Sequence, residues 1–514
     1  MSQLEAPAPG RSTAFWLLGF GAVAMAAGIA LGPKSALAGA AIFVGLAILA
    51  MRELATPTIT WANAVACFVL LMWLVPSKGY RLPVTLPFNL EPYRLVLAAL
   101  LFVLVMALIG GRAKLRFLGF GAAVAVLASA ATVSAILNYN DIGGDAGDPG
   151  AIKSLSYFLG FLAVFVLVAA VIRTHEQIDT VLRAFVVGAA IVAAAAIYES
   201  RSGYNAFDHL AEWFPVLIRE SRAIFEGRGG NLRVYASAQH PIALSAALFM
   251  AFPLALYLVG RASSQLRARL WIVAAAVCAM GAVATISRTT VIMGVALAAV
   301  GLWLRRRQVI RFWPLLLVLP FAIHFAVPGA LGGIYKAFFP AQGLGSDLYV
   351  RSGESGSGRF ADIEPGIRLW EAAPLFGQGI GAQLTTGQAG ASDPAASAEG
   401  AVLIFDNQWL NTLVATGFVG LVGALWFVWG SFGSIGRYAR RVVGPRSDLA
   451  AACAAAICAF GVSMLVFDAF AFIQVTIFFF MIVALGLTAR LQPADRSPSA
   501  GGSSRGATPG RPGP

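Results

Sequence analysis

Four arginines stand out as residues that could bind a phosphate-containing ligand: Arg233, Arg288, Arg359 and Arg368. A guanidinium group stays charged at physiological pH and offers two parallel N–H donors to a phosphate. Arg288 is the sharpest case, because it lies between two apolar segments with no acidic residue near it in the sequence. A cation at membrane depth is costly and normally faces a cavity, a partner or a ligand.

Each arginine also has a purely structural interpretation. Arg288 is equally typical of an interfacial side chain that snorkels to the membrane surface, and Arg233 of an ordinary loop charge. Arg368 has glutamates four residues before it and three after it, a spacing that favours an ion pair on one helix face. Arg359 precedes that predicted helix, so the helical spacing offers it no glutamate partner of this kind. These alternatives remain open at the level of sequence.

Two further residues are candidates for moving protons, Asp406 and His240. Asp406 precedes the apolar segment 410–429, so it is either the N-cap of that helix or a general base directed into a cavity. The two roles compete, because a helix N-terminus lowers the pKa of a carboxylate and weakens it as a base. His240 begins the apolar segment 242–259 close to Arg233, although a lone histidine is more often structural.

The sequence contains no motif for a nucleotide, a catalytic metal or a serine nucleophile: a Walker A loop, HExxH and GxSxG are all missing. The glycine-rich run Gly377–Gly381 is not preceded by a predicted strand, so it is no dinucleotide fingerprint. We therefore expect no cofactor and no metal site. An enzyme of this kind would need a substrate that brings its own activation.

A membrane-embedded helical bundle must position these residues. Of 514 residues, 59% are hydrophobic and only 12% charged, against about 25% charged in soluble domains. Apolar runs near span length predict an all-α, polytopic transmembrane helix bundle of about 14 spans, within a range of 12–14. The predicted spans are 14–31, 36–51, 59–75, 95–109, 117–137, 155–172, 181–197, 242–259, 270–286, 290–304, 312–327, 410–429, 449–466 and 470–487.

The charge distribution predicts which ends of the spans lie in the cytoplasm. With both termini inside, most of the 37 Lys and Arg fall on the inner side, whereas most of the 24 Asp and Glu fall outside. This is the pattern that the positive-inside rule requires. The net charge of +13 is therefore a topology signal, and no nucleic acid is needed to explain it.

The chain is expected to have three parts: a cytoplasmic N-terminus (1–13), a transmembrane domain (14–488) and a disordered cytoplasmic tail (489–514). Two outer loops, 198–241 and 328–409, are too long to be simple turns, and connections of this length usually carry function. An apolar helical pattern at 207–218 predicts that the first of these loops is partly helical and lies on the membrane surface.

Three stretches resemble the O-antigen ligase and polymerase superfamily of bacterial polysaccharide assembly. They are an arginine followed by His-Pro at a span start (233–244), a Ser-Arg pair opening a span (286–289), and an outer loop with its following helix (358–417). The likeness covers a core of about 232–420. It implies that the arginines hold the pyrophosphate of a polyprenyl-linked glycan, such as undecaprenyl pyrophosphate, and that Asn407 belongs to the binding site.

One departure from the family pattern affects the expected reaction. Ligases of this family carry a histidine at the mouth of the helix where this chain has Asp406, and that histidine is regarded as activating the acceptor. The departure favours a metal-independent membrane glycosyltransferase of the exopolysaccharide or O-antigen polymerase type over a ligase that joins glycan to lipid A-core. The resemblance implies the bacterial inner membrane, with loops 198–241 and 328–409 in the periplasm.

The expected partners are a polyprenyl-pyrophosphate-linked glycan, an acceptor glycan or lipid-linked saccharide, and membrane lipid. Other polysaccharide-assembly proteins are further candidate partners. A transporter or flippase is the alternative from another class of protein. Transporters tend to place charged sites near the membrane midplane and often contain inverted repeats. Here the candidate charges gather at the outer face and no repeat is found in the sequence, which favours the enzyme.

Overall fold

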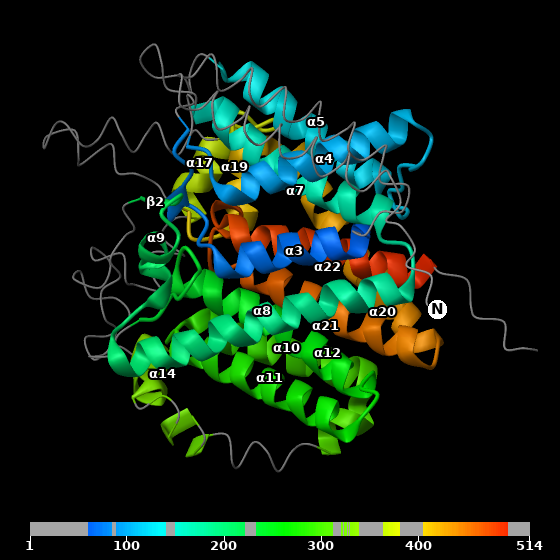
Figure 1. Cartoon of the computed structure of the whole chain (residues 1–514). Helices are drawn as coiled ribbons and strands as arrows, with labels where there is room; N and C mark the ends of the chain where they lie inside the picture. The colour runs from blue at the N-terminus through cyan, green and yellow to red at the C-terminus, as the bar shows by residue number, and fades with distance from the viewer. Residues whose placement is uncertain are drawn as a thin grey trace, which may run out of the picture.

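The computed structural model shows a bundle of long α-helices (Figure 1). It describes residues 60–84, 89–139, 150–220, 233–311, 320–321, 323–325, 327, 329–338, 363–380 and 405–491. Within these ranges the only strands are β1 (Tyr80–Arg81) and β2 (Ile218–Arg219), which pair antiparallel with Tyr80 opposite Arg219. The predicted all-α fold is therefore confirmed.

Most of the predicted spans coincide with helices of the structure. Nine helices in the described ranges are long and apolar enough to cross a membrane, and two shorter apolar helices, α3 and α5, accompany them. The predicted spans 14–31 and 36–51, and most of 312–327, lie outside the described residues. The span helices are α3 (Trp61–Leu74), α4 (Pro92–Ile109), α5 (Gly121–Leu137), α7 (Gly150–Val171), α8 (His175–Ser202), α10 (Pro241–Gly260), α11 (Gln265–Ala284), α12 (Arg288–Arg311), α19 (Gln408–Leu425), α21 (Pro445–Ser463) and α22 (Ile473–Leu491).

Shorter elements complete the fold. A π-helical turn, η3 (Trp426–Gly430), and α20 (Ser431–Arg441) continue α19 without a loop. The others are η1 (Ala206–Asp208), α9 (Leu210–Trp213), α14 (Ala330–Phe338), α17 (Ile363–Ala372) and η4 (Ala469–Ala471).

The helix expected at 207–218 is shorter than its apolar pattern. Helical turns end at Trp213, and Ile218 belongs to β2, because pairing with β1 satisfies the backbone there. Trp213, Phe214 and Val216 are all more than half exposed. Such a group of exposed apolar side chains fits the expected position on a membrane surface.

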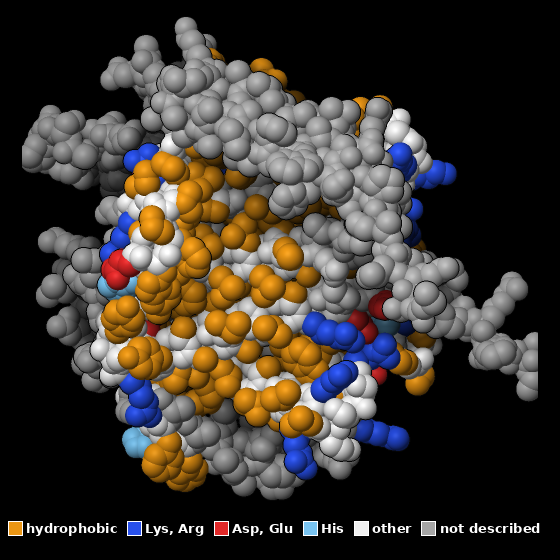
Figure 2. Space-filling view, in the orientation of Figure 1, with side chains coloured by type: hydrophobic (Ala, Val, Ile, Leu, Met, Phe, Trp, Pro, Cys, Tyr) orange, Lys and Arg blue, Asp and Glu red, His pale blue; other side chains and the backbone are white. Residues whose placement is uncertain are grey.

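Helix α22 forms the centre of the bundle. It is buried along almost its whole length and packs against α7, α10, α20 and α21. Its phenylalanines stack on neighbouring rings, with centroid distances of 4.6 Å from Phe479 to Phe460 and 5.1 Å from Phe480 to Phe427. A helix that is apolar on every side must be enclosed by protein or lipid, and here it is enclosed by its neighbours. The outer helices instead expose a broad apolar surface (Figure 2).

Hydrogen bonds between helix ends define two ends of the bundle. The side-chain Nε2 of Gln474, at the start of α22, donates a hydrogen bond to the carbonyl oxygen of Met72 near the end of α3, at 2.5 Å. At the other end, Arg261 after α10 pairs with Asp179 near the start of α8 at 3.1 Å. We call the first the polar end, which lies at the left of Figure 1 where α9, β2 and α17 are labelled, and the second the opposite end. The span ends that the sequence predicts on the outer side of the membrane lie together at the polar end.

Candidate functional site

The connection between α21 and α22 fastens the start of α19 to the start of α10 at the polar end. The backbone N–H of Gln408 donates to the carbonyl of Met464 at 2.8 Å, and its side-chain Oε1 accepts from the Phe470 N–H at 2.6 Å. The Gln239 Oε1 accepts from the Ile473 N–H at 2.7 Å. Asp406, two residues before Gln408, and His240, directly after Gln239, are therefore both held close to this short connection.

The N-cap of α19 is Asn407 and not Asp406. The Asn407 Oδ1 accepts from the N–H groups of Trp409 and Leu410 at 3.0 and 3.3 Å, which satisfies two otherwise orphaned donors. Asp406 lies one residue earlier and is half-buried. The capping role considered for Asp406 is therefore filled by its neighbour Asn407. The predicted binding role of Asn407 stays a prediction, with its Oδ1 already engaged by the helix.

Asp468 is the acidic residue that sequence reasoning missed. It precedes η4, is half-buried, and receives hydrogen bonds from the Asn411 side chain and the Ala471 backbone. Burial, together with the negative charge of nearby Asp406, raises the pKa of the Asp468 carboxyl to about 6. The two hydrogen bonds and the charge of Lys78 act in the opposite direction. Two carboxyl groups, those of Asp406 and Asp468, thus lie near the mouth of α19, close enough for one to act on the other electrostatically.

A charged cluster borders this carboxyl pair. Glu91, buried before α4, accepts from the Lys78 N–H at 2.7 Å and pairs with Arg94 at 3.2 Å. Arg94 also donates to the Tyr157 hydroxyl at the start of α7. Because Lys78 acts electrostatically on Asp468, this cluster belongs to the same end of the molecule. No spacing or motif in the sequence connects Lys78, Glu91 and Tyr157 with Asp468.

His240 caps α10. Its Nδ1 accepts from the Ile242 N–H at 3.0 Å, and Pro241 occupies the first helical position, which needs no donor. The imidazole packs against Phe472 in the α21–α22 connection, with ring centroids 5.4 Å apart. Accepting through Nδ1 places the proton of the neutral ring on Nε2. His240 therefore has a structural role, and its predicted catalytic role remains a prediction.

Arg288 opens α12 and is buried, with only 8% of its surface exposed. The residues around it, Ser287, Thr289 and Thr290, are buried polar side chains. The Thr290 hydroxyl hydrogen-bonds to the Ser245 hydroxyl of α10 at 2.7 Å. The start of α12 thus lies against the first half of α10, the helix that His240 caps. A snorkelling side chain would be exposed at its tip, so burial favours the interpretation that Arg288 faces an internal ligand or partner.

Arg233 is half-buried and leads into a segment that α8 holds in place. The buried carboxylate of Glu199 accepts from the Ala236 N–H at 2.8 Å and from the Tyr235 N–H at 3.4 Å. The Asn205 side chain donates to the Ala236 carbonyl at 3.0 Å. This scaffold fixes the backbone that connects Arg233 to His240.

Arg368 is engaged by a neighbour on its own helix. Arg368 lies on α17 and forms an exposed ion pair with Glu364 at 2.5 Å, the helical pair that its spacing favours. Both side chains are about three-quarters exposed. Arg359 lies outside the described residues. The predicted binding roles of Arg359 and Arg368 stay predictions.

Two glycines let the segment after α17 contact α19 backbone to backbone. Gly377 and Gly417 both have positive φ, and a Cβ on either would come within 2.4 Å of a backbone carbonyl oxygen of the other segment. The Phe418 N–H donates to the Pro374 carbonyl at 2.9 Å across this contact. The glycine-rich run 377–381 therefore serves close packing, and it orders the helix that carries Asp406 and Asn407 at its start.

Metal ligation finds no support in the described ranges, which contain no group of three or more His, Cys, Asp or Glu able to hold an ion. What the polar end offers is a buried arginine, a half-buried arginine, a carboxyl pair and a histidine. This set suits a ligand with anionic and hydroxyl groups.

The bundle is that of a polytopic α-helical membrane protein, with a group of charged and polar side chains at one end. Residues 273–425 match the family model described as O-Antigen ligase. This match supports the resemblance to the O-antigen ligase-like family over that stretch of the chain. The matched stretch contains Arg288, Asp406 and Asn407, whereas Arg233 and His240 precede it and Asp468 follows it. No match was found among curated proteins.

Proposed function

We propose that this protein, whose general role is O-antigen ligase or polymerase-type polysaccharide assembly, transfers or polymerises glycan from a polyprenyl-pyrophosphate donor onto an acceptor sugar. The reaction takes place at the periplasmic face of the bacterial inner membrane. The observation that carries the proposal is the burial of Arg288 at the start of α12, inside the stretch that matches the ligase family. A buried guanidinium at a helix N-terminus suits a pyrophosphate group.

The reaction forms one bond and breaks one. The oxygen of the acceptor hydroxyl bonds to the anomeric carbon of the donor glycan, and the bond from that carbon to the pyrophosphate oxygen breaks. Polyprenyl pyrophosphate leaves with the electron pair, and Arg288 and Arg233 stabilise the charge that develops on it. Asp406 accepts the proton of the acceptor hydroxyl.

Polymerase-like activity is favoured over ligation to lipid A-core by one residue. The chain has Asp406, next to the cap residue of α19, where ligases of the family have a histidine. Purified protein supplied with a polyprenyl-pyrophosphate oligosaccharide should lengthen the glycan and release the lipid carrier. Lipid release without lengthening, and only when a lipid A-core acceptor is added, would assign it to the ligases. Movement of intact donor across vesicles without either product would assign it to the transporters.

The proposed sidedness predicts the behaviour of topology reporters. A reporter fused after Arg490 should act as cytoplasmic, because Arg437, Arg440 and Arg441 gather at the same end of the bundle. A reporter inserted near Ser392 should be exported. At each site two reporters are measured: one that is active only after export and one that is active only in the cytoplasm. An exported tail, or a cytoplasmic loop at Ser392, would contradict the proposed orientation.

The carboxyl pair predicts the acidic limb of the pH profile. Transfer requires ionised carboxylates, so the rate should fall about tenfold per pH unit below roughly pH 6, where Asp468 takes up a proton. Asp468→Asn removes the group that titrates near pH 6, so the limb should move to lower pH. Initial rates between pH 4.5 and 8 measure this. A limb unchanged by Asp468→Asn would assign the titration to another group, with His240 the first to test.

A further inference from the structure

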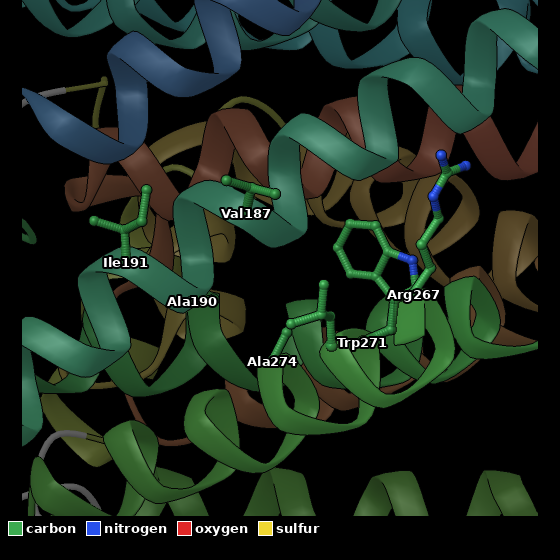
Figure 3. A pocket seen from close by; sticks show the side chains of 7 residues that line it. Val187, Ala190, Ile191, Arg267, Trp271 and Ala274 are labelled. Atoms are coloured by element: carbon green, nitrogen blue, oxygen red, sulfur yellow. The ribbon is translucent and has the colours of Figure 1, made fainter. Parts of the chain in front are cut away.

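A groove lies between α8 and α11 (Figure 3). None of the candidate site residues lines it. It has a volume of about 270 Å³, and its walls are almost entirely apolar. Val187, Ile191 and Leu270 remain 42%, 48% and 58% exposed there. The lining residues are Val187, Ala190 and Ile191 of α8 with Arg267, Leu270, Trp271 and Ala274 of α11.

The groove results from where the two helices touch. Gly281 of α11 lies directly against Ala193 of α8, since a Cβ on the glycine would come within 2.8 Å of the alanine Cβ. This contact of small residues brings the helices together toward the polar end. On the side nearer the opposite end, Trp271 stands between the helices and Arg267 extends from α11 toward α8 (Figure 3). The larger side chains there leave room between the backbones.

The two helices carry the same pattern of side chains. Arg183 of α8 is followed by groove residues four, seven and eight positions later, and Arg267 of α11 by groove residues three, four and seven positions later. Residues at these spacings share one helix face. Both helices run from the opposite end toward the polar end. Each therefore presents an exposed arginine toward the opposite end and an apolar stripe toward the membrane interior.

These arginines are not neutralised within the described part of the chain. Arg267 donates to the Ser263 hydroxyl at 2.8 Å, and neither it nor Arg183 forms an ion pair with a described residue. Asp179, the buried acid of this region, already pairs with Arg261 at 3.1 Å. Glu176, two turns before Arg183, is the exposed acid on the same helix. Figure 2 shows Lys and Arg side chains gathered beside the apolar surface toward the right, at the opposite end.

We propose that this groove binds an anionic phospholipid, with one acyl chain between α8 and α11 and its phosphate at Arg183 and Arg267. An apolar channel in a membrane-facing surface with two basic side chains at one end matches the shape and charge of such a lipid. A polyprenyl donor held at Arg288 has its pyrophosphate at the other end of the bundle. The groove is therefore a lipid site separate from the proposed donor site, and its test needs no activity assay.

Native mass spectrometry of the full-length protein tests the headgroup contact. Phosphatidylglycerol and phosphatidylcholine with identical acyl chains are added in equal amounts, and the ratio of the bound lipids is measured. Each basic residue near an anionic lipid contributes about 1 kcal/mol, or about fivefold. Arg183→Gln with Arg267→Gln should therefore lower the preference for phosphatidylglycerol by up to about 30-fold. Arg269→Gln is the matched control, because it removes an exposed arginine from the same turn of α11 on another face.

A second variant tests the acyl-chain channel. Ala274→Phe fills the groove and leaves both arginines in place, so it should reduce binding of both phospholipids while Arg269→Gln binds as the unaltered protein does. An unchanged phosphatidylglycerol preference in the double-arginine variant, or an equal loss in Arg269→Gln, would overturn the proposal. So would preferential displacement of phosphatidylglycerol by a polyprenyl phosphate. A segment of the chain seated in the groove would leave both substitutions without effect, which also contradicts it.

Discussion

Asp406→Asn should lower the rate of glycan transfer by roughly 10²–10⁴-fold in a protein that remains folded. Asparagine keeps the shape of the side chain but has no basic oxygen that can take up the acceptor proton. The helix start should be unaffected, because Asn407 already supplies both capping hydrogen bonds of α19. Initial rates with a polyprenyl-pyrophosphate oligosaccharide measure the loss, and the thermal unfolding midpoint of each purified variant checks the fold.

The replacement of Asp406 by histidine separates a base from a structural carboxylate. Asp406→His should be tolerated better than Asp406→Asn, since an imidazole can also accept a proton. Asn407→Ala makes the complementary change, because it removes the cap and should cost about 1 kcal/mol of stability. An Asp406→Asn variant with normal activity would return Asp406 to a structural role, and His240 would become the first candidate base.

The helices of this protein are readable from sequence because each span is a long apolar run. The ends of the helices are harder to predict from sequence, and α8 is an example. Its predicted span was 181–197, whereas the helix covers His175–Ser202. A capping box of Thr174 and Gln177 starts the helix at polar residues, and Gly203 ends it in a left-handed conformation. A hydropathy pattern sees only the apolar centre, so it misses polar turns at both ends.

The candidate site was only partly readable, for a different reason. Arg288 and Asp406 attract attention as charged residues at the borders of apolar runs. Asp468 also lies at such a border, yet nothing in its spacing connects it to Asp406. The connection depends on tertiary hydrogen bonds, from Gln408 to Met464 and from Phe470 to Gln408. Choosing between Asp406 and Asn407 as the cap was equally beyond sequence, because both residue types cap well.

Replacing Arg288 should disable the enzyme almost equally whether lysine or alanine takes its place. Lysine keeps the charge but loses the planar pair of donors that fits a phosphate. Loss of a buried, charged hydrogen-bond pair costs about 2–5 kcal/mol, which corresponds to a rate lower by roughly 30- to 4,000-fold. Arg233→Lys should show the same behaviour to a smaller extent, since that side chain is only half-buried. Steady-state kinetics with varied donor concentration measure the effect.

Arg219→Lys provides the matched control at the same end of the bundle. Arg219 is half-exposed and pairs with Asp208 at 3.5 Å, so its replacement should change the rate by less than about fivefold. A rise in the donor KM with unchanged kcat in Arg288→Lys would mean that Arg288 binds the pyrophosphate equally in the ground and transition states. A fall in kcat would assign it to the leaving group. Full polymer production by both Arg288→Ala and Arg233→Ala, at normal protein levels, would exclude these arginines from the donor site.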